Sequence, residues 1–126
     1  FFTQNEQHLS QPVRIMIDEN GIIILDEPEI HLHPEWQLKF AEIIVLIQKE
    51  FNTNILLNTH SPYFLNAIEV YSEKYAIEKK CNYYLANEEH GITSIVDVTK
   101  ETEKIYAKLA KPLQELENIE YGNAEV

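Results

Sequence analysis

The feature that most constrains the fold is the run from Gly21 to Pro28, in which the apolar residues 22–25 are followed directly by Asp26 and Glu27. A continuous β-branched run bounded by glycine and proline is typical of a strand buried on both faces of a parallel sheet. In such sheets, ligands bind beyond the carboxyl ends of the strands. The run therefore predicts that Asp26 and Glu27 lie at the mouth of a site.

The residues after this strand predict a strand–helix–strand unit. A helix that begins with proline is expected over 34–50, because apolar residues recur there at helical spacing. A second strand is expected over 55–57, which implies a parallel crossover connection. Ser61 and Pro62 then have the residue types of an N-cap and a first helical position, so a second helix is expected over 62–74.

The last third of the chain predicts a β-hairpin and a terminal helix. Strand-like segments at 81–86 and 92–98 flank a turn-forming segment at 87–91. Thr99 is expected to cap the final helix, and Pro112 is expected to break or kink it. The segment 121–126 has the composition of a frayed tail.

These elements divide the chain into three parts of one small domain. Residues 1–126 are expected to contain an irregular lead-in at 1–20, a core at 21–80, and a hairpin with a terminal helix at 81–126. Within the lead-in, 11–18 fits a strand and a helix equally well.

Composition limits the partners and the compartment. With 21 acidic and 10 basic residues, the formal net charge is -11, which repels nucleic-acid backbones. We therefore expect nucleic acid to be engaged only through a larger intact protein. The single cysteine, Cys81, and the lack of a membrane-length apolar run predict a cytoplasmic protein without a membrane partner.

Two motifs carry a family resemblance. Segment 22–27 resembles the Walker B strand of ABC-type ATPases, and its continuation Asp-Glu-Pro-Glu-Ile-His-Leu-His-Pro resembles the branch that includes the SMC, RecF and OLD proteins. Segment 58–62, Asn-Thr-His-Ser-Pro, resembles the switch-histidine loop of that branch. The resemblance is clearest over 21–71. It implies an α/β, P-loop NTPase-like partial domain, with a mostly parallel sheet, flanking helices, and the C-terminal hairpin and helix.

The resemblance also implies roles for individual residues. Asp26 matches the residue that holds Mg²⁺, and Glu27 matches the general base that activates water. His60 matches the histidine that contacts the terminal phosphate, so ATP and Mg²⁺ are the implied cofactors. The segment in the place of the D-loop, which contacts the partner subunit in ABC dimers, consists of Glu29, Ile30, His31, Leu32 and His33.

One part of the family pattern is missing. Phosphate binding uses a Gly-x-x-x-x-Gly-Lys-[Ser/Thr] loop, but none of the three glycines is followed by lysine, and the signature motif is also absent. We therefore expect the C-terminal part of an ABC-type ATPase domain that is inactive alone and active in the intact protein. The resemblance implies a homodimer or a second ATPase head, an optional nuclease or effector partner, and a DNA-repair or defence-type role.

Two other functions remain open on the residues alone. One is a metal-dependent hydrolase or nuclease, because the ligand types needed for zinc or manganese are present in Asp26, Glu27, Glu29, His31, His33 and His60. The alternation of His31 and His33, directly before a proline and a helix start, argues against that site. The other is a non-catalytic interaction module, which the missing phosphate loop favours.

Overall fold

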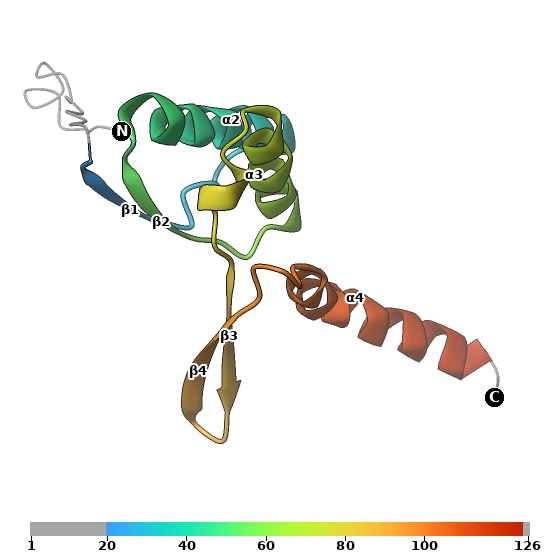
Figure 1. Cartoon of the computed structure of the whole chain (residues 1–126). Coiled ribbons are helices and arrows are strands. Elements are labelled where there is room, and N and C mark those ends of the chain that lie inside the picture. Colours follow the sequence, from blue (N-terminus) through green and yellow to red (C-terminus); the bar gives the residue numbers. More distant parts are fainter. Residues whose placement is uncertain (1–19, 125–126) are drawn as a thin grey trace, which may run out of the picture.

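The computed structural model of the protein describes residues 20–124, so the predictions for the lead-in and for 11–18 lie outside the described residues. The elements follow one another as shown in Figure 1. In chain order they are β1 (Ile22–Asp26), α2 (Pro34–Phe51), β2 (Asn54–Asn58), α3 (Pro62–Lys74), the 3-10 turn η1 (Glu78–Lys80), β3 (Tyr84–Glu89), β4 (Ile92–Asp97) and α4 (Glu103–Ala124).

Strands β1 and β2 form a two-stranded parallel sheet. The register begins with Ile22 opposite Asn54 and ends with Asp26 opposite Asn58. Because α2 connects the two strands, the predicted strand–helix–strand unit is confirmed. Both strands end at the same edge of the sheet, which is where the sequence places its polar motifs.

The prediction that the first strand is buried on both faces is wrong for the described residues. Ile23 and Leu25 are half-buried, whereas Ile22 and Ile24 are 76% and 71% exposed, and Leu56 on β2 is exposed in the same way. Both helices lie on one side of the pair in Figure 1. Among residues 20–124, nothing therefore covers the other, apolar face of the sheet.

The two core helices begin and end close to where the sequence predicts. Pro34 opens α2, and His33 before it caps the helix by accepting a hydrogen bond on Nδ1 from the backbone N–H of Glu35. Ser61 caps α3, since its Oγ accepts from the backbone N–H of Phe64 at 3.1 Å. The helix boundaries thus follow from local capping chemistry.

The core lies between these helices and the inner face of the sheet. Its centre contains Ala41 and Ile44 from α2, with Phe64 and Ala67 from α3. The rings of Phe40 and Phe64 are stacked with centroids 6.0 Å apart, and half-buried strand side chains, including Leu25, pack against the cluster. This cluster fixes α2 and α3 against the two strands that end at the predicted site.

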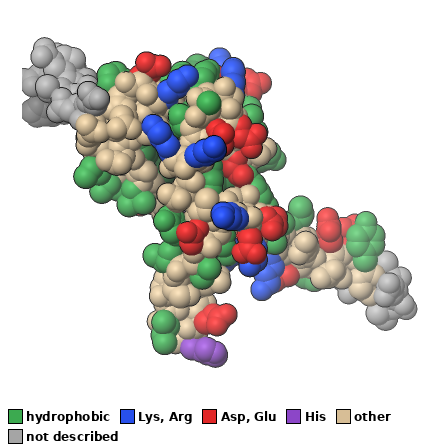
Figure 2. Space-filling view, in the orientation of Figure 1, with side chains coloured by type: hydrophobic (Ala, Val, Ile, Leu, Met, Phe, Trp, Pro, Cys, Tyr) green, Lys and Arg blue, Asp and Glu red, His purple; other side chains and the backbone are tan. Residues whose placement is uncertain are grey.

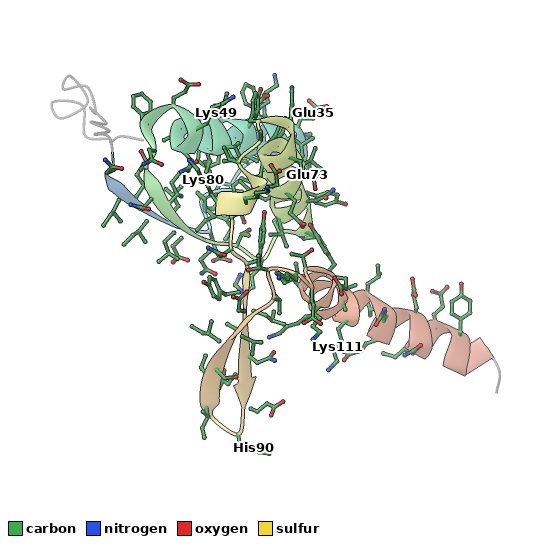
Figure 3. The ribbon with its side chains drawn as sticks, viewed as in Figure 1. Glu35, Lys49, Glu73, Lys80, His90 and Lys111 are labelled. Carbon is green, nitrogen blue, oxygen red and sulfur yellow. The ribbon has the colours of Figure 1, made fainter. Side chains whose placement is uncertain are left out.

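Strands β3 and β4 form a separate antiparallel sheet. The hairpin prediction is confirmed, and the parallel sheet that was predicted beside it has only two strands among the described residues. The turn is also shorter than predicted: His90 and Gly91 have φ of 53° and 77°, as a two-residue hairpin turn requires. Glu88 and Glu89 consequently pair with β4. Figure 3 shows His90 at the tip.

Helix α4 differs from the prediction at both ends, and it is not broken at its proline. The helix begins after Thr102, whose carbonyl accepts from the backbone N–H of Ile105 at 2.9 Å. Thr99 does not cap it, because its hydroxyl donates to Asp97 and accepts from the backbone of Tyr83. The helix continues through Pro112 and includes Tyr121, so neither a break at the proline nor a frayed end at Tyr121 is present.

The surface of the described residues is mixed in character. Lysine and acidic side chains are scattered over the helical part of the body, and apolar side chains appear on the hairpin and on α4 (Figure 2). Within residues 20–124, none of the helices combines the length and the apolar character needed to cross a bilayer.

We predict that Phe64→Ala destabilises the chain by about 3–5 kcal/mol, because it removes a fully buried ring from the centre of the core. The neighbouring exposed ring provides the control: Tyr63→Ala should change the free energy of unfolding by less than about 0.5 kcal/mol. Urea denaturation followed by circular dichroism measures both values. Equal losses for the two variants would contradict the placement of the core.

Candidate functional site at the edge of the parallel sheet

The last residues of β1 and β2 hold each other in place. Asn58 donates from Nδ2 to Oδ1 of Asp26 at 2.7 Å. The backbone N–H of Glu27 donates to the carbonyl of Asn58 at 2.8 Å, which continues the strand pairing one residue beyond β1. The carboxylate of Asp26 is therefore oriented at an exposed strand end.

The backbone turns sharply at Glu27. Its φ is 45°, in the left-handed region that residues with a Cβ seldom adopt. Such strained residues are concentrated at functional sites. The turn ends the extended conformation directly after Asp26. In a regular strand the side chains of Asp26 and Glu27 would point to opposite faces of the sheet, and the turn removes this requirement.

The turn brings Glu27 into contact with His60. Nδ1 of His60 lies 2.6 Å from Oε1 of Glu27, so an ionised carboxylate requires the proton to be on Nδ1. The side chains of His60 and Glu27 are 75% and 33% exposed. A pair this exposed contributes little to stability, whereas Nε2 of His60 and the second oxygen of Glu27 remain accessible to a ligand.

The segment Glu29–His33 forms consecutive turns that lead into α2. The backbone N–H of Leu32 donates to the carbonyl of Glu29 at 2.9 Å. The side chain of Glu29 is buried, and within residues 20–124 its Oε1 has no hydrogen-bond partner. Ile30 and His31 are exposed, Leu32 is half-buried, and His33 caps α2. The exposed residues of this segment are thus Ile30, His31 and His33.

Sequence reasoning missed two residues that organise this edge. Asn58 is the first residue of the second motif, and its side chain orients Asp26. Gln37 lies outside both motifs, yet its Nε2 donates to the carbonyl of Leu32 at 3.1 Å and its Oε1 accepts from Oγ of Ser61 at 2.9 Å. The signal available in the sequence was a glutamine in the first turn of the predicted helix, where its amide can bond residues that precede the helix.

The Gln37 contacts join the two motifs. Leu32 belongs to the segment after Glu27, and Ser61 follows His60 directly. Because one amide bridges both segments, Gln37 restricts the position of His60 relative to the loop that carries Glu27. The edge of the sheet is therefore one connected polar arrangement.

The donor set at this edge fits Mg²⁺ better than a closed metal site. No three His, Cys, Asp or Glu side chains of residues 20–124 are arranged to hold a metal ion, which argues against zinc held by His31, His33 and the acidic residues. Mg²⁺ is usually bound through one or two carboxylates, with water and phosphate oxygens as the other ligands. The exposed carboxylate of Asp26 suits that role.

A small hollow away from the edge of the parallel sheet has unsuitable chemistry for a nucleotide. It has a volume of about 150 Å³ and is lined by Glu69, Glu73, Glu78, Cys81, Tyr83, Thr99 and Thr102. Burial raises the pKa of the Tyr83 hydroxyl. Burial also raises the pKa of Tyr106, which donates to Glu69 beside this hollow. Three carboxylates in so small a space repel phosphate groups.

Comparison with known proteins places the similarity over this edge. Residues 13–65 match the family described as AAA ATPase domain. The matched stretch contains Asp26, Glu27 and His60, together with β1, α2 and β2. Over these residues the chain is similar to an AAA-type ATPase domain.

Three curated relatives are similar to a part of this chain. The Septu protein PtuA of Bacillus thuringiensis is 38% identical over 53 residues, which are 42% of this chain and 13% of that protein. The Retron Ec83 probable ATPase of Escherichia coli is 39% identical over 54 residues, or 42% of this chain and 9% of the relative. The Retron Vc95 probable ATPase of Vibrio cholerae serotype O1 biovar El Tor is 36% identical over 64 residues, or 50% and 12%.

The matches thus span about a tenth of the length of the curated relatives. The names of two of these relatives support an ATPase at a coarse level.

We predict that Gln37→Met destabilises the chain by about 1–2 kcal/mol, because the change removes both side-chain hydrogen bonds while keeping the side-chain length. Gln114→Met on the exposed part of α4 is the matched control and should have little effect. In a double-mutant cycle with Ser61→Ala, the two effects should be non-additive by about 0.5 kcal/mol or more. Strictly additive unfolding free energies would contradict the bridge.

Proposed function

We propose that this chain supplies the magnesium and water half of the ATPase site of an ABC-type protein of the SMC/RecF/OLD branch. The observation that carries the proposal is the contact of Glu27 with His60 beside Asp26, at the edge where β1 and β2 end. The match of residues 13–65 to an AAA ATPase domain supports it. A DNA-repair or defence-type protein is the proposed setting.

Each of the three side chains has a distinct proposed role. Asp26, oriented by Asn58, holds Mg²⁺, which when bound offsets the negative charge of the phosphates. Glu27 keeps one oxygen on His60 and uses the other to accept a proton from the attacking water. His60, fixed through Nδ1, presents Nε2 to the terminal phosphate, where a protonated ring would donate a hydrogen bond.

The site is proposed to be complete only in a larger assembly. These 126 residues contain no glycine–lysine phosphate loop, so a second lobe must supply the backbone donors for the phosphates. The exposed apolar face formed by Ile22, Ile24 and Leu56 is consistent with a second lobe that packs on this face of the sheet. Ile30, His31 and His33, which are exposed after Glu27, are proposed to face a second ATPase head.

We predict that Glu27→Gln, in the polypeptide or complex that also carries the phosphate loop, lowers ATP turnover about a hundredfold or more, because an amide cannot accept the proton from water. ATP binding should be retained, since the variant keeps Asp26 and the shape of the side chain. Phosphate-release kinetics and nucleotide binding by fluorescence measure the two effects separately.

The matched control is Glu35→Gln, which removes an exposed carboxylate near the start of α2, away from the labelled Lys49 end (Figure 3). This control should leave turnover unchanged. His60→Ala should slow turnover as well, because Glu27 then loses its orienting partner. Wild-type turnover in Glu27→Gln would refute the role of Glu27 as the base.

A further inference from the structure

The side-chain amide of Gln37 makes hydrogen bonds whose direction is fixed by its partners. The carbonyl of Leu32 can only accept, so the amide nitrogen of Gln37 must face it, and Nε2 lies 3.1 Å away. The amide oxygen then faces Ser61, whose hydroxyl donates to it at 2.9 Å. The oxygen of that hydroxyl also accepts from the backbone N–H of Phe64. The bridge from Leu32 to Ser61 is therefore defined in both position and polarity.

One end of this bridge is anchored in the loop that carries Glu27. The backbone N–H of Ile30 donates to the carbonyl of Glu27 at 3.2 Å, and that of Leu32 donates to the carbonyl of Glu29 at 2.9 Å. The side chain of Glu29 is buried. Because these turns overlap, the carbonyl of Leu32 is held in a defined place relative to Glu27.

The other end of the bridge is anchored beside His60. The backbone N–H of Ser61 donates to Oγ1 of Thr59 at 3.0 Å, which closes a tight turn with His60 at its centre. Ser61 also caps α3, and the core cluster packs α3 against α2. The turn that carries His60 is therefore tied to Gln37 at its C-terminal end.

The side chain of His60 depends on this turn for its position. It is 75% exposed, and within residues 20–124 its hydrogen-bond partner is Glu27, at 2.6 Å. An ion pair at this exposure is weak, because water and salt screen it and two flexible side chains must be ordered to form it. The Gln37 bridge joins half-buried neutral groups, which salt does not screen. It is therefore the more persistent constraint on where His60 lies relative to Glu27.

We propose that Gln37 is a positioning residue for the proposed reaction and that it acts through His60. The inference rests on the proposed ATPase function. The bridge keeps His60 in register with Glu27, so that Nε2 of the imidazole reaches the terminal phosphate while Glu27 accepts the proton from water. Gln37 itself touches neither group. Because a misplacement of about 1 Å can lower a rate about a hundredfold, loosening this turn should slow the chemical step.

The first test is ATP turnover in the polypeptide or complex that also carries the phosphate loop. Gln37→Met should lower kcat about tenfold and change the dissociation constant of Mg-ATP less than about twofold, because the lost contact matters in the transition state. Ser61→Ala should lower kcat in the same way, and Ser61→Thr, which restores the hydroxyl, should recover most of the loss. Phosphate-release kinetics and nucleotide binding by fluorescence measure the two quantities.

The matched control is Ile44→Val. It shortens a buried side chain on the same helix and so lowers stability, but it leaves the bridge intact. Its kcat and its dissociation constant should both stay within about twofold of the wild type. This control separates the positioning role of Gln37 from a general loss of stability.

The second test is a double-mutant cycle on turnover. Gln37→Met should lower kcat about tenfold when His60 is present and less than about twofold in the His60→Ala background, because a residue that acts through His60 has nothing to position once the imidazole is gone. A structural role of Gln37 alone would give the same loss in both backgrounds.

The third test needs no turnover and uses the full 126-residue chain. Nitrogen-15 relaxation reports the order parameter of the backbone N–H of His60. Gln37→Met should lower it from about 0.85, the value of a rigid backbone, to about 0.6. Ile44→Val should leave it unchanged. Circular dichroism establishes that each variant is folded at the temperature of the measurement.

Failure of this inference can be distinguished from failure of the proposed function. Wild-type kcat in Gln37→Met, together with lost turnover in Glu27→Gln, would overturn the role of Gln37 and leave the ATPase role intact. An equal loss of kcat with and without His60, or an unchanged order parameter at His60, would also overturn it. Undiminished turnover in Glu27→Gln would overturn both proposals.

Discussion

The parallel pairing of β1 with β2 is the interaction on which the candidate site depends. Its register places Asp26 opposite Asn58. Glu27 follows Asp26 directly and His60 lies two residues after Asn58, so both belong to the same edge of the sheet. A shift of one residue would move every strand side chain to the other face. The buried cluster around Phe64 fixes the register indirectly, because α2 and α3 pack on the inner face of the pair.

The sequence was sufficient for the features that are governed locally. The start of α3 follows from Ser61 and Pro62, and the edge position of Asp26 follows from the apolar run before it. The burial of the strand was predicted wrongly, because a β-branched run does not reveal which segment covers its second face. Ile24 has the composition of a doubly buried residue and is exposed among the described residues.

Other features depend on side-chain contacts that cannot be predicted from the spacing of residues in the sequence. The bridge from Gln37 to Leu32 and Ser61 joins positions up to 24 residues apart, and only the packing of α2 against α3 brings them together. Pro112 was expected to break or kink α4, and the helix continues through it, so a break is excluded. The left-handed conformation of Glu27 is likewise a consequence of the strand end and its neighbours.

The polar edge has carboxylates and a histidine that suit the metal and water side of phosphoryl transfer. In the proposed account this edge is incomplete without a phosphate-binding lobe, because these 126 residues contain no glycine–lysine phosphate loop.

Calorimetric titration of the 126-residue chain with Mg-ATP tests the half-site account most directly. The account predicts no measurable binding, because the residues that would cradle the phosphates are absent from this sequence. Micromolar binding that Asp26→Ala abolishes would contradict it. Such a result would mean that the edge of the two-stranded sheet already forms a complete nucleotide site.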